Sequence, residues 1–455
     1  MSSSNNTSTN NFLFSKELSL CFLSKSDILK QLNSLFGCVY LENNGQPVIG
    51  FLPEKYCIQI QDVHHVFDRD KDLKYKKNID ISSLSDFIMF QSMSNQDEFG
   101  YFNGGYIGFI DYNFATQAQV KTQFRQQPNA YLGCYKSFIR NENNHWIFHS
   151  LESNAQKIFD LLEEIINQPD QSNFKLTAPC HAQWKKSEYI QSFEKIQEYI
   201  VAGDCYQINL TQAFTAKATG NLIETAEDFW SLTNAPYAGY LKLDEFELLS
   251  CSPELFIDFK NEREIVTRPI KGTMPRYADP LRDQQSKNTL KHSEKDQAEN
   301  LMIVDLLRND LSVYAEKGSV KTPQLFEIES FNQVHHMVSE VRATLKADVH
   351  PFDMLLSALP GGSITGAPKI RAMQIIEELE SSPRGAYCGS MGYFNFDGTG
   401  SWNILIRSIQ KYQDDVSIWA GGGITIASNA DAEYQECFDK VSAMLDLLNT
   451  WYQPE

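Results

Sequence analysis

The chain has 455 residues, 42% of them hydrophobic, which is enough to bury a large core and fits two or three domains or one large fold. Its formal net charge of −18 argues against nucleic acid as a partner, because acidic side chains repel phosphates and the sequence shows no basic patch. The nine cysteines form no CxxC pair, so the sequence predicts neither a disulfide framework nor a zinc site, and a cytoplasmic location is the default expectation.

The N-terminal part is predicted to be a disordered tail followed by a β-rich subdomain. Residues 1–11 are polar and lack the basic and apolar regions of a signal peptide, and no stretch has the roughly 18 consecutive apolar residues of a membrane span. Residues 12–180 alternate short β-forming runs with loops. The expected strands cover 38–42, 46–51, 56–60, 106–111 and 146–149, and the expected helices cover 25–36 and 152–166.

A second subdomain is predicted over residues 181–455. It begins with a helix over 186–202, which ends at Gly203 in the usual helix-stop position. Strands are expected over 206–214, 240–243, 248–251, 334–342, 387–395, 404–410 and 416–420, and helices over 295–309, 367–379 and 429–448. Because strands and helices do not alternate strictly, we predict an α+β fold with an antiparallel or mixed sheet covered by helices.

Lys271 is the first candidate for catalysis. It lies between Pro269 and Gly272, which predicts a fixed bend after the β-forming segment 263–268. An amine held away from water at such a bend can act as a nucleophile. Most lysines in turns are solvated surface charges, so this alternative remains open for Lys271 considered alone.

Two pairs of acidic residues have the spacing of one helix face. Asp296 and Glu299 are three residues apart in one predicted helix, and Glu433 and Glu436 repeat that spacing in the last one. If the helices converge, these carboxylates offer the oxygen ligands that magnesium accepts. A solvated helix face is the alternative for each pair. Lys440 follows Glu436 by one turn and could pair with it or reach an anionic ligand.

Two glycine-rich runs are candidates for anion binding. The run at 360–369 precedes a predicted helix, whose free amides and dipole suit an anion, but it lacks the lysine after Gly366 that a P-loop requires. The run at 420–424 follows a predicted strand and allows the backbone to approach a ligand closely. Tight turns alone would also explain both runs.

Further polar side chains lie on or beside the predicted strands. Arg407 is on a strand expected beside that of Tyr387, where a clamp for a carboxylate is its natural use. His336 is a candidate acid or base, with a hydrogen-bonded core histidine as the alternative. Glu254 precedes an apolar run, where burial could raise its pKa, or where it simply caps the strand end.

Long motifs cover the second half almost continuously. They are CYQINL at 205–210, SPELF at 252–256, RPIKGT at 268–273, KDQAENLMIVDLLRNDL at 295–311, VHHMVS at 334–339, PGGSITGAPKIRAMQIIEELE at 360–380, AGGGI at 420–424 and AEYQECFDK at 432–440. On these motifs the chain resembles the chorismate-utilising enzymes, and among them the aminodeoxychorismate synthase component I family, which prepares the precursor of 4-aminobenzoate for folate synthesis. The resemblance implies an α+β fold of mostly antiparallel sheets packed as a sandwich, with helices on the outside.

The resemblance also implies a cofactor and a set of substrate contacts. Magnesium would be held by Glu299 and Glu436, with Asp296 and Glu433 positioning its waters. The carboxylates of chorismate would be met by Tyr387, Arg407, Thr365, Lys440 and the amides of Gly421, Gly422 and Gly423.

The mechanism implied by the resemblance is covalent. Lys271 would attack C2 of chorismate with loss of the C4 hydroxyl, after which ammonia would add at C4 and expel the lysine. Glu254 and His336 would handle protons, and Thr273 belongs to the same catalytic motif. Gln207 stands where relatives that add water carry a lysine, so water addition is disfavoured. Since the sequence has no Cys-His-Glu glutaminase signature, a separate glutamine amidotransferase subunit, component II, would supply ammonia.

Three rival functions and one regulatory site remain open. An anthranilate synthase component I would share the acids but add ammonia at C2, eliminate pyruvate and typically carry alanine at position 271. A non-catalytic metabolite-binding regulator would not need a nucleophile, and a magnesium enzyme acting on phosphates would need more basic residues near the glycine runs than this sequence has. A tryptophan site could involve Leu41, Asn43 and Pro236, although Asn43 stands where the family's serine is expected.

Overall fold

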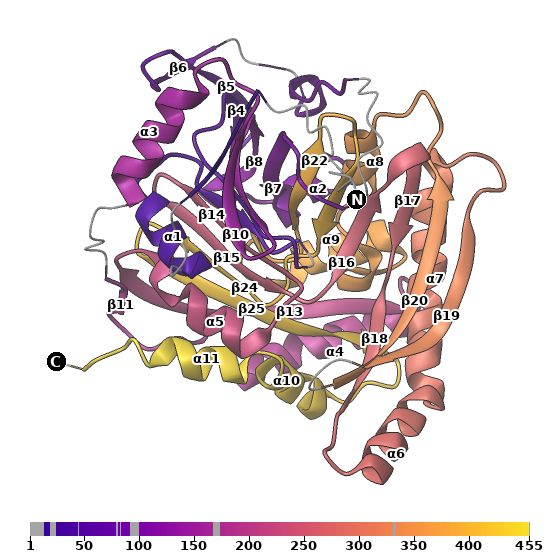
Figure 1. Cartoon of the computed structure of the whole chain (residues 1–455). Helices are drawn as coiled ribbons and strands as arrows, with labels where there is room; N and C mark the ends of the chain where they lie inside the picture. The colour runs from indigo at the N-terminus through magenta and orange to yellow at the C-terminus, as the bar shows by residue number, and fades with distance from the viewer. Residues whose placement is uncertain are drawn as a thin grey trace.

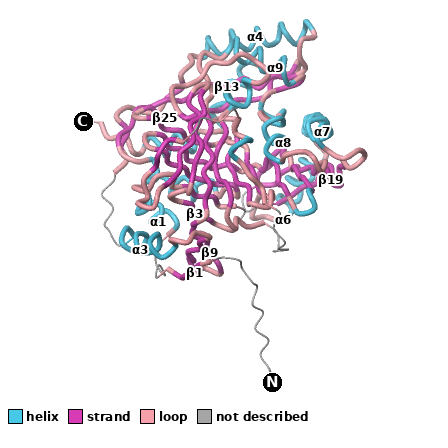
Figure 2. Tube along the Cα trace, turned by 90° about the horizontal axis from the view of Figure 1, so that it is seen from above, coloured by secondary structure: helices cyan, strands magenta, loops and turns pink. Residues whose placement is uncertain are grey.

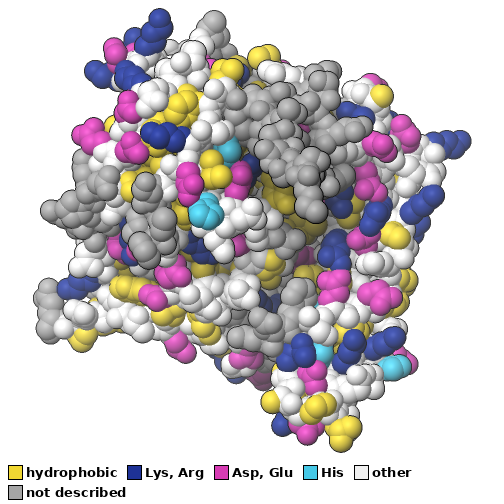
Figure 3. Space-filling model, viewed as in Figure 1, with side chains coloured by type: hydrophobic (Ala, Val, Ile, Leu, Met, Phe, Trp, Pro, Cys, Tyr) yellow, Lys and Arg dark blue, Asp and Glu magenta, His cyan; other side chains and the backbone are white. Residues whose placement is uncertain are grey.

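The computed structural model describes residues 13–18, 24–43, 45–78, 81, 83–91, 100–166, 173–330 and 334–454 (Figure 1). The predicted tail at residues 1–11 lies outside this part of the chain. Within it, no helix has the length and apolar character that crossing a membrane requires. Basic and acidic side chains are interspersed over the described surface of the face in Figure 3.

The first of two large antiparallel sheets has 13 strands. In spatial order they are β1 (Phe14–Glu17), β10 (His145–Ser150), β9 (Ser137–Glu142), β3 (Val48–Gly50), β2 (Val39–Leu41), β14 (Tyr237–Leu243), β15 (Phe246–Ser252), β24 (Ser408–Tyr412), β25 (Asp415–Thr425), β13 (Gln207–Thr219) and β11 (Lys175–Leu176), with β12 (His181–Ala182) and β21 (Gly366–Ala367) paired to β13.

The second sheet has 12 strands, which are also antiparallel. Their order is β18 (Ile270–Pro275), β20 (Val334–Thr344), β17 (Glu264–Thr267), β16 (Leu255–Phe259), β23 (Gly400–Asn403), β22 (Ser390–Asn395), β7 (Gly105–Ile110), β8 (Pro128–Tyr135), β4 (Lys55–Ile60), β5 (Val63–Arg69) and β6 (Tyr75–Lys77), with β19 (Lys321–Ser330) beside β20.

Helices lie at the periphery of the two sheets (Figure 2). In the described residues they are α1 (Lys25–Leu32), α2 (Tyr112–Gln117), α3 (Ala155–Ile166), α4 (Lys186–Ala202), α5 (Ala226–Thr233), α6 (Pro280–Lys291), α7 (Glu294–Tyr314), α8 (Pro351–Ala358), α9 (Lys369–Leu379), α10 (Ala430–Asp439) and α11 (Ser442–Asn449). The expected α+β fold of packed antiparallel sheets with outer helices is therefore confirmed.

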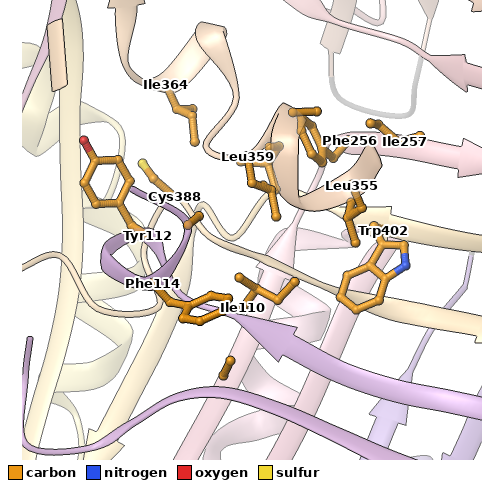
Figure 4. Close-up of a cluster of buried hydrophobic side chains, with 14 of the residues drawn as sticks. Ile110, Tyr112, Phe114, Phe256, Ile257, Leu355, Leu359, Ile364, Cys388 and Trp402 are labelled. Carbon is orange, nitrogen blue, oxygen red and sulfur yellow. The ribbon is translucent and has the colours of Figure 1, made fainter. Parts of the chain in front are cut away.

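Hydrophobic side chains fill the space between the sheets and the spaces under the helices. Phe109 of β7 stacks on Phe246 of β15 with ring centroids 5.1 Å apart, which joins the inner faces of the two sheets. Another core cluster includes Leu355 of α8 and Trp402 of β23 (Figure 4). Apolar faces of α1, α3, α5 and α11 contribute to a third cluster on the first sheet.

The two halves of the sequence share both sheets. N-terminal strand β2 pairs with β14, and N-terminal strand β7 pairs with β22. The predicted boundary near residue 180 falls between β11 and β12. This boundary separates two parts of the sequence, but each sheet contains strands from both parts.

One predicted helix is confirmed, whereas several other predicted elements have different limits in the structure. The helix over 186–202 is confirmed, with Gly203 in the left-handed conformation at φ 83°. The single helix predicted over 429–448 is wrong, because Val441 leaves the helical conformation and separates α10 from α11. The strands predicted over 387–395 and 404–410 begin later, so Tyr387 and Arg407 lie in the connections that precede them. Tyr387 is buried there, whereas the Arg407 side chain is exposed. The apolar residues of these connections have the composition of a strand.

Candidate active site

A cavity of about 700 Å³ lies among β13, β18, β25, α7 and α10. This volume is typical of a site for a small molecule. Most of the predicted site residues line it, although they come from distant parts of the sequence. They are Lys271, Glu254, Thr273, Tyr387, Arg407, Gly421, Gly423, Lys440, Asp296, Glu299, Glu433 and Glu436.

Lys271 is half-buried on β18, at one end of the second sheet. The register between β18 and β20 shifts between Ile270 and Thr273, and Gly272 has φ 79°. The predicted bend is therefore an irregularity within a strand rather than a turn after one. A Cβ at position 272 would lie 2.9 Å from Cγ of Asp296, so glycine allows α7 to approach the lysine strand closely.

Glu254 lies in the connection between β15 and β16, and its carboxyl is close enough to Lys271 and Arg407 to feel both charges. Burial raises the pKa of Glu254 to about 7, although the two cations and a hydrogen bond from the Ile270 backbone oppose the increase. Near neutral pH this carboxyl can therefore give or take a proton within the cavity.

If the substrate is the chorismate that the sequence resemblance implies, we expect kcat/KM to fall above an apparent pKa of about 7, because protonated Glu254 is the form that can donate a proton to a leaving hydroxyl. The measurement is a pH profile at constant free ammonia. Glu254→Gln should remove this inflection and lower the rate by about 10²- to 10⁴-fold.

Asp111 provides the matched control for that profile. Burial also raises its pKa to about 7, but it caps α2 and does not line the cavity. Each of these carboxyls binds a proton more tightly in the folded chain, so each contributes stability that decreases as pH rises toward 7. The Asp111→Asn variant should keep the inflection in the pH profile of kcat/KM. If the inflection disappears in this variant, the pH dependence reflects the stability of the fold and not the protonation of Glu254.

His336 lies on β20 opposite Thr273 and does not line the cavity. Its Nδ1 is hydrogen-bonded to Thr273 Oγ1 at 2.9 Å. Burial, assisted by Arg407, lowers the pKa of His336. In this arrangement the imidazole reaches the cavity through the Thr273 hydroxyl.

Arg407 and Tyr387 provide a cationic and an aromatic contact surface. Among the described residues, Arg407 has no carboxylate within ion-pair distance, although it lines the cavity. Its backbone is held with φ 50°, and its carbonyl accepts a hydrogen bond from the Cys251 amide at 3.1 Å. Tyr387 stacks on Trp419, a cavity residue that the sequence analysis missed, with centroids 6.0 Å apart.

The acidic pairs of α7 and α10 face the same cavity. Burial raises the pKa of Glu433, and the nearby charge of Glu436 adds to this, while a hydrogen bond from Ser428 opposes it. Lys440 Nζ lies 2.6 Å from Glu436 Oε1 and also donates to the Gly421 carbonyl at 2.8 Å. Of the two alternatives predicted for Lys440, the structure therefore shows the ion pair, and the contact with an anionic ligand stays a prediction.

The donor set fits a hydrated magnesium ion better than a closed protein cage. Within the described ranges, no group of three or more acidic, histidine or cysteine side chains converges tightly enough to hold a metal. Magnesium usually keeps several waters and binds through one or two carboxylates plus substrate. A Cβ at Gly422 would lie 2.8 Å from Glu433 Oε2 and 3.1 Å from Glu436 Oε1, so this glycine leaves room for the carboxylates.

Three predicted substrate residues lie behind the cavity surface. The buried Thr365 hydroxyl donates to the Gly361 carbonyl at 3.0 Å, Gly422 backs the α10 acids, and Gln207 is buried against Gly423. Polar cavity residues that the prediction missed include Asn209 and Ser363, which lie inside the motifs that carried it, and Ser428 and Asn429, which lie between the last two motifs. Their polar character was the available signal.

The possible tryptophan residues are separate from this cavity. Leu41 and Asn43 line a recess of about 20 Å³, and Asn43 also lines a neighbouring cavity of about 290 Å³ with Tyr237 and Tyr393. Pro236 lines neither of them. The tryptophan site stays a prediction.

The sequence pattern of the chorismate binding enzymes matches residues 38–446 of this chain. The chain belongs to the chorismate binding enzyme family. This family member is 48% identical over 282 residues to aminodeoxychorismate synthase component 1 of Klebsiella aerogenes, covering 62% of each protein. It is 41% identical over 354 residues to the protein of that name from Escherichia coli K12, covering 76% of this chain and 77% of the relative.

Further proteins are similar to this chain at lower identity. Anthranilate synthase component 1 of Bacillus subtilis is 37% identical over 312 residues, covering 67% of this chain and 60% of the relative. The crystal structure of anthranilate synthase component I from Streptococcus pneumoniae superposes with a TM-score of 0.75 at 25% identity, covering 88% of this chain and 91% of that one. The isochorismate synthase MenF of Escherichia coli shares the fold, with a TM-score of 0.69 at 18% identity.

Proposed function

We propose that this chorismate binding enzyme is an aminodeoxychorismate synthase component I, which converts chorismate and ammonia to 4-amino-4-deoxychorismate for 4-aminobenzoate and folate biosynthesis. The observation that carries the proposal is the position of Lys271 in one cavity with Glu254, Arg407 and the two acidic pairs. A lysine nucleophile, a carboxyl with a pKa of about 7 and a cation for carboxylates are the groups that this reaction needs.

In the proposed reaction, the Lys271 nitrogen bonds to C2 of chorismate, the ring double bond shifts and the C4–O bond breaks. Glu254 gives its proton to the departing hydroxyl, which leaves as water, and the attacking nitrogen loses a proton. Ammonia then bonds to C4 and loses a proton, the ring double bond shifts back, and the C2–N bond breaks. The departing lysine nitrogen takes up a proton, which returns Lys271 as the free amine. Arg407 and Lys440 would hold the substrate carboxylates in place, and Thr273 with His336 would relay protons at the same wall.

We further propose that Glu299 and Glu436 hold Mg²⁺, with Asp296 and Glu433 orienting its waters. When bound, the ion would neutralise a substrate carboxylate among these acids. The mutual repulsion of Glu433 and Glu436, which contributes to the raised pKa of Glu433, supports a cation at this position.

Ammonia is proposed to come from a separate glutamine amidotransferase subunit. The eight cysteines in the described ranges are free and buried, and burial raises the pKa of each thiol. A glutaminase needs an accessible thiolate nucleophile, so none of these thiols is suited to that role. Unpaired cysteines also suit the reducing cytoplasm that we propose as the location.

The test is to incubate the purified protein with chorismate, Mg²⁺ and an ammonium salt and to identify the product by mass spectrometry. We expect aminodeoxychorismate without pyruvate. The second candidate is anthranilate synthase, favoured by the Streptococcus pneumoniae structure, and it would yield anthranilate with pyruvate. That product would overturn the proposed function.

A further inference from the structure

A buried ion pair lies directly behind the wall of the candidate active site. Glu380, at the end of α9, and Arg384 have side chains that are only 4% and 1% exposed. Arg384 donates from Nη2 to Glu380 Oε1 at 2.7 Å and from Nε to Oε2 at 2.8 Å. The guanidinium also lies over the Tyr112 ring, 4.6 Å from its centroid. Figure 4 shows Tyr112 in the same buried cluster as Ile364.

The same guanidinium holds two segments of the cavity wall by their main-chain carbonyls. Arg384 Nη1 donates to the Ile364 carbonyl at 3.0 Å, and Nη2 donates to the Asn209 carbonyl at 2.7 Å. Both Ile364 and Asn209 line the cavity. They are also joined to each other, because Asn209 Nδ2 donates to the Ile364 carbonyl at 3.0 Å.

Glu380 extends this connection along β13. Its Oε1 accepts hydrogen bonds from the Thr211 amide at 3.0 Å and from the Thr211 hydroxyl at 2.8 Å. One ion pair therefore ties together β13, the loop at 361–365 and the segment that leads to Tyr387. All three carry residues that line the cavity.

Stability alone does not account for a charged pair at this position. Burying two charges costs desolvation energy, and apolar residues of similar volume are often equally stable or more so. A planar guanidinium has several N–H donors in fixed directions, which allows it to set the relative positions of a carboxylate and two carbonyls. A lysine at this position would keep the charge but could not reproduce that geometry.

We propose that Arg384 is a positioning residue for chorismate, which it never touches. By fixing the carbonyls of Ile364 and Asn209 from behind, it sets the shape of the wall that those residues present to the substrate. The inference rests on the proposed function, because it names chorismate as the ligand.

The test compares Arg384→Lys with Arg69→Lys. Arg69 forms a similar buried pair with Glu152, the side chains being 2% and 7% exposed, and also donates to the Leu52 carbonyl, but it does not line or back the cavity. Chorismate affinity is measured by calorimetry in the presence of Mg²⁺, below the melting temperature of either variant. We expect Arg384→Lys to raise Kd and KM at least about tenfold with kcat within about threefold, and Arg69→Lys to change none of them.

An Arg384→Lys variant that only melts earlier, or that changes Kd no more than Arg69→Lys does, would overturn the proposal. If Arg384→Lys does not fold, the double variant Glu380→Gln with Arg384→Met removes both charges and should show the same loss of affinity; wild-type affinity in it would also reject the proposal. Anthranilate as the wild-type product refutes only the proposed function, whereas a wild type that binds no chorismate refutes both.

Discussion

Replacing Lys271 with methionine is expected to lower aminodeoxychorismate formation by on the order of 10³-fold or more, because the variant keeps most of the apolar side chain but loses the nucleophile. Without ammonia, intact mass spectrometry of the wild type should show an adduct of chorismate minus water, and the variant should show none. Since the Lys271 charge lowers the pKa of Glu254, the variant should also shift any remaining pH inflection upward.

Lys295→Met is the matched control for the adduct. Lys295 lines the same cavity, with its side chain 83% exposed. The adduct should persist in this variant because the nucleophile is intact. If the Lys271 variant still forms the adduct, or if both variants lose it equally, Lys271 is not the attacking amine.

Glu299→Gln and Glu436→Gln are each expected to weaken magnesium-dependent turnover by at least about 100-fold, because each removes one of the proposed carboxylate ligands while keeping the side-chain volume. A second readout does not depend on catalysis. Mg²⁺ should raise the melting temperature of the wild type through binding to the folded state, and this increase should be lost in both variants.

Glu294→Gln tests whether any loss of acid charge on α7 has the same effect. Glu294 is an exposed residue at the first position of that helix and does not line the cavity. The Glu294→Gln variant should retain both the turnover and the magnesium-dependent stabilisation. Equal loss in all three variants would show that the effect of magnesium depends on general surface charge, and not on a site between α7 and α10.

Much of the fold and of the cavity could be predicted because the relevant signals are local. The helix at 186–202 follows from periodicity and a glycine stop, and the acidic pairs follow from helical spacing. The motif order placed Lys271, Glu254 and the acids in one predicted site, and the structure brings them to one cavity.

What the sequence could not predict depends on distant contacts. Tyr387 and Arg407 lie in loops that are held by partners such as the Cys251 amide, and these partners are remote in sequence. Thr365 was expected to reach the substrate, yet its hydroxyl is used by the Gly361 carbonyl. No periodicity indicates that Arg384 would contact both Asn209 and Ile364.

The pairing of β2 with β14 and of β7 with β22 has a consequence for how the chain reaches this state. During synthesis, about 200 further residues are added after β2, and nearly 300 after β7, before the partner strand of each is made. Until then, one edge of each strand is unpaired and exposed. Contacts between residues so far apart in sequence slow folding. The chain loses conformational entropy when the intervening loop closes, and this loss comes before the strand pairing stabilises the structure. We therefore expect refolding to be slow and prone to aggregation at high protein concentration, with the two halves acquiring their native structure together.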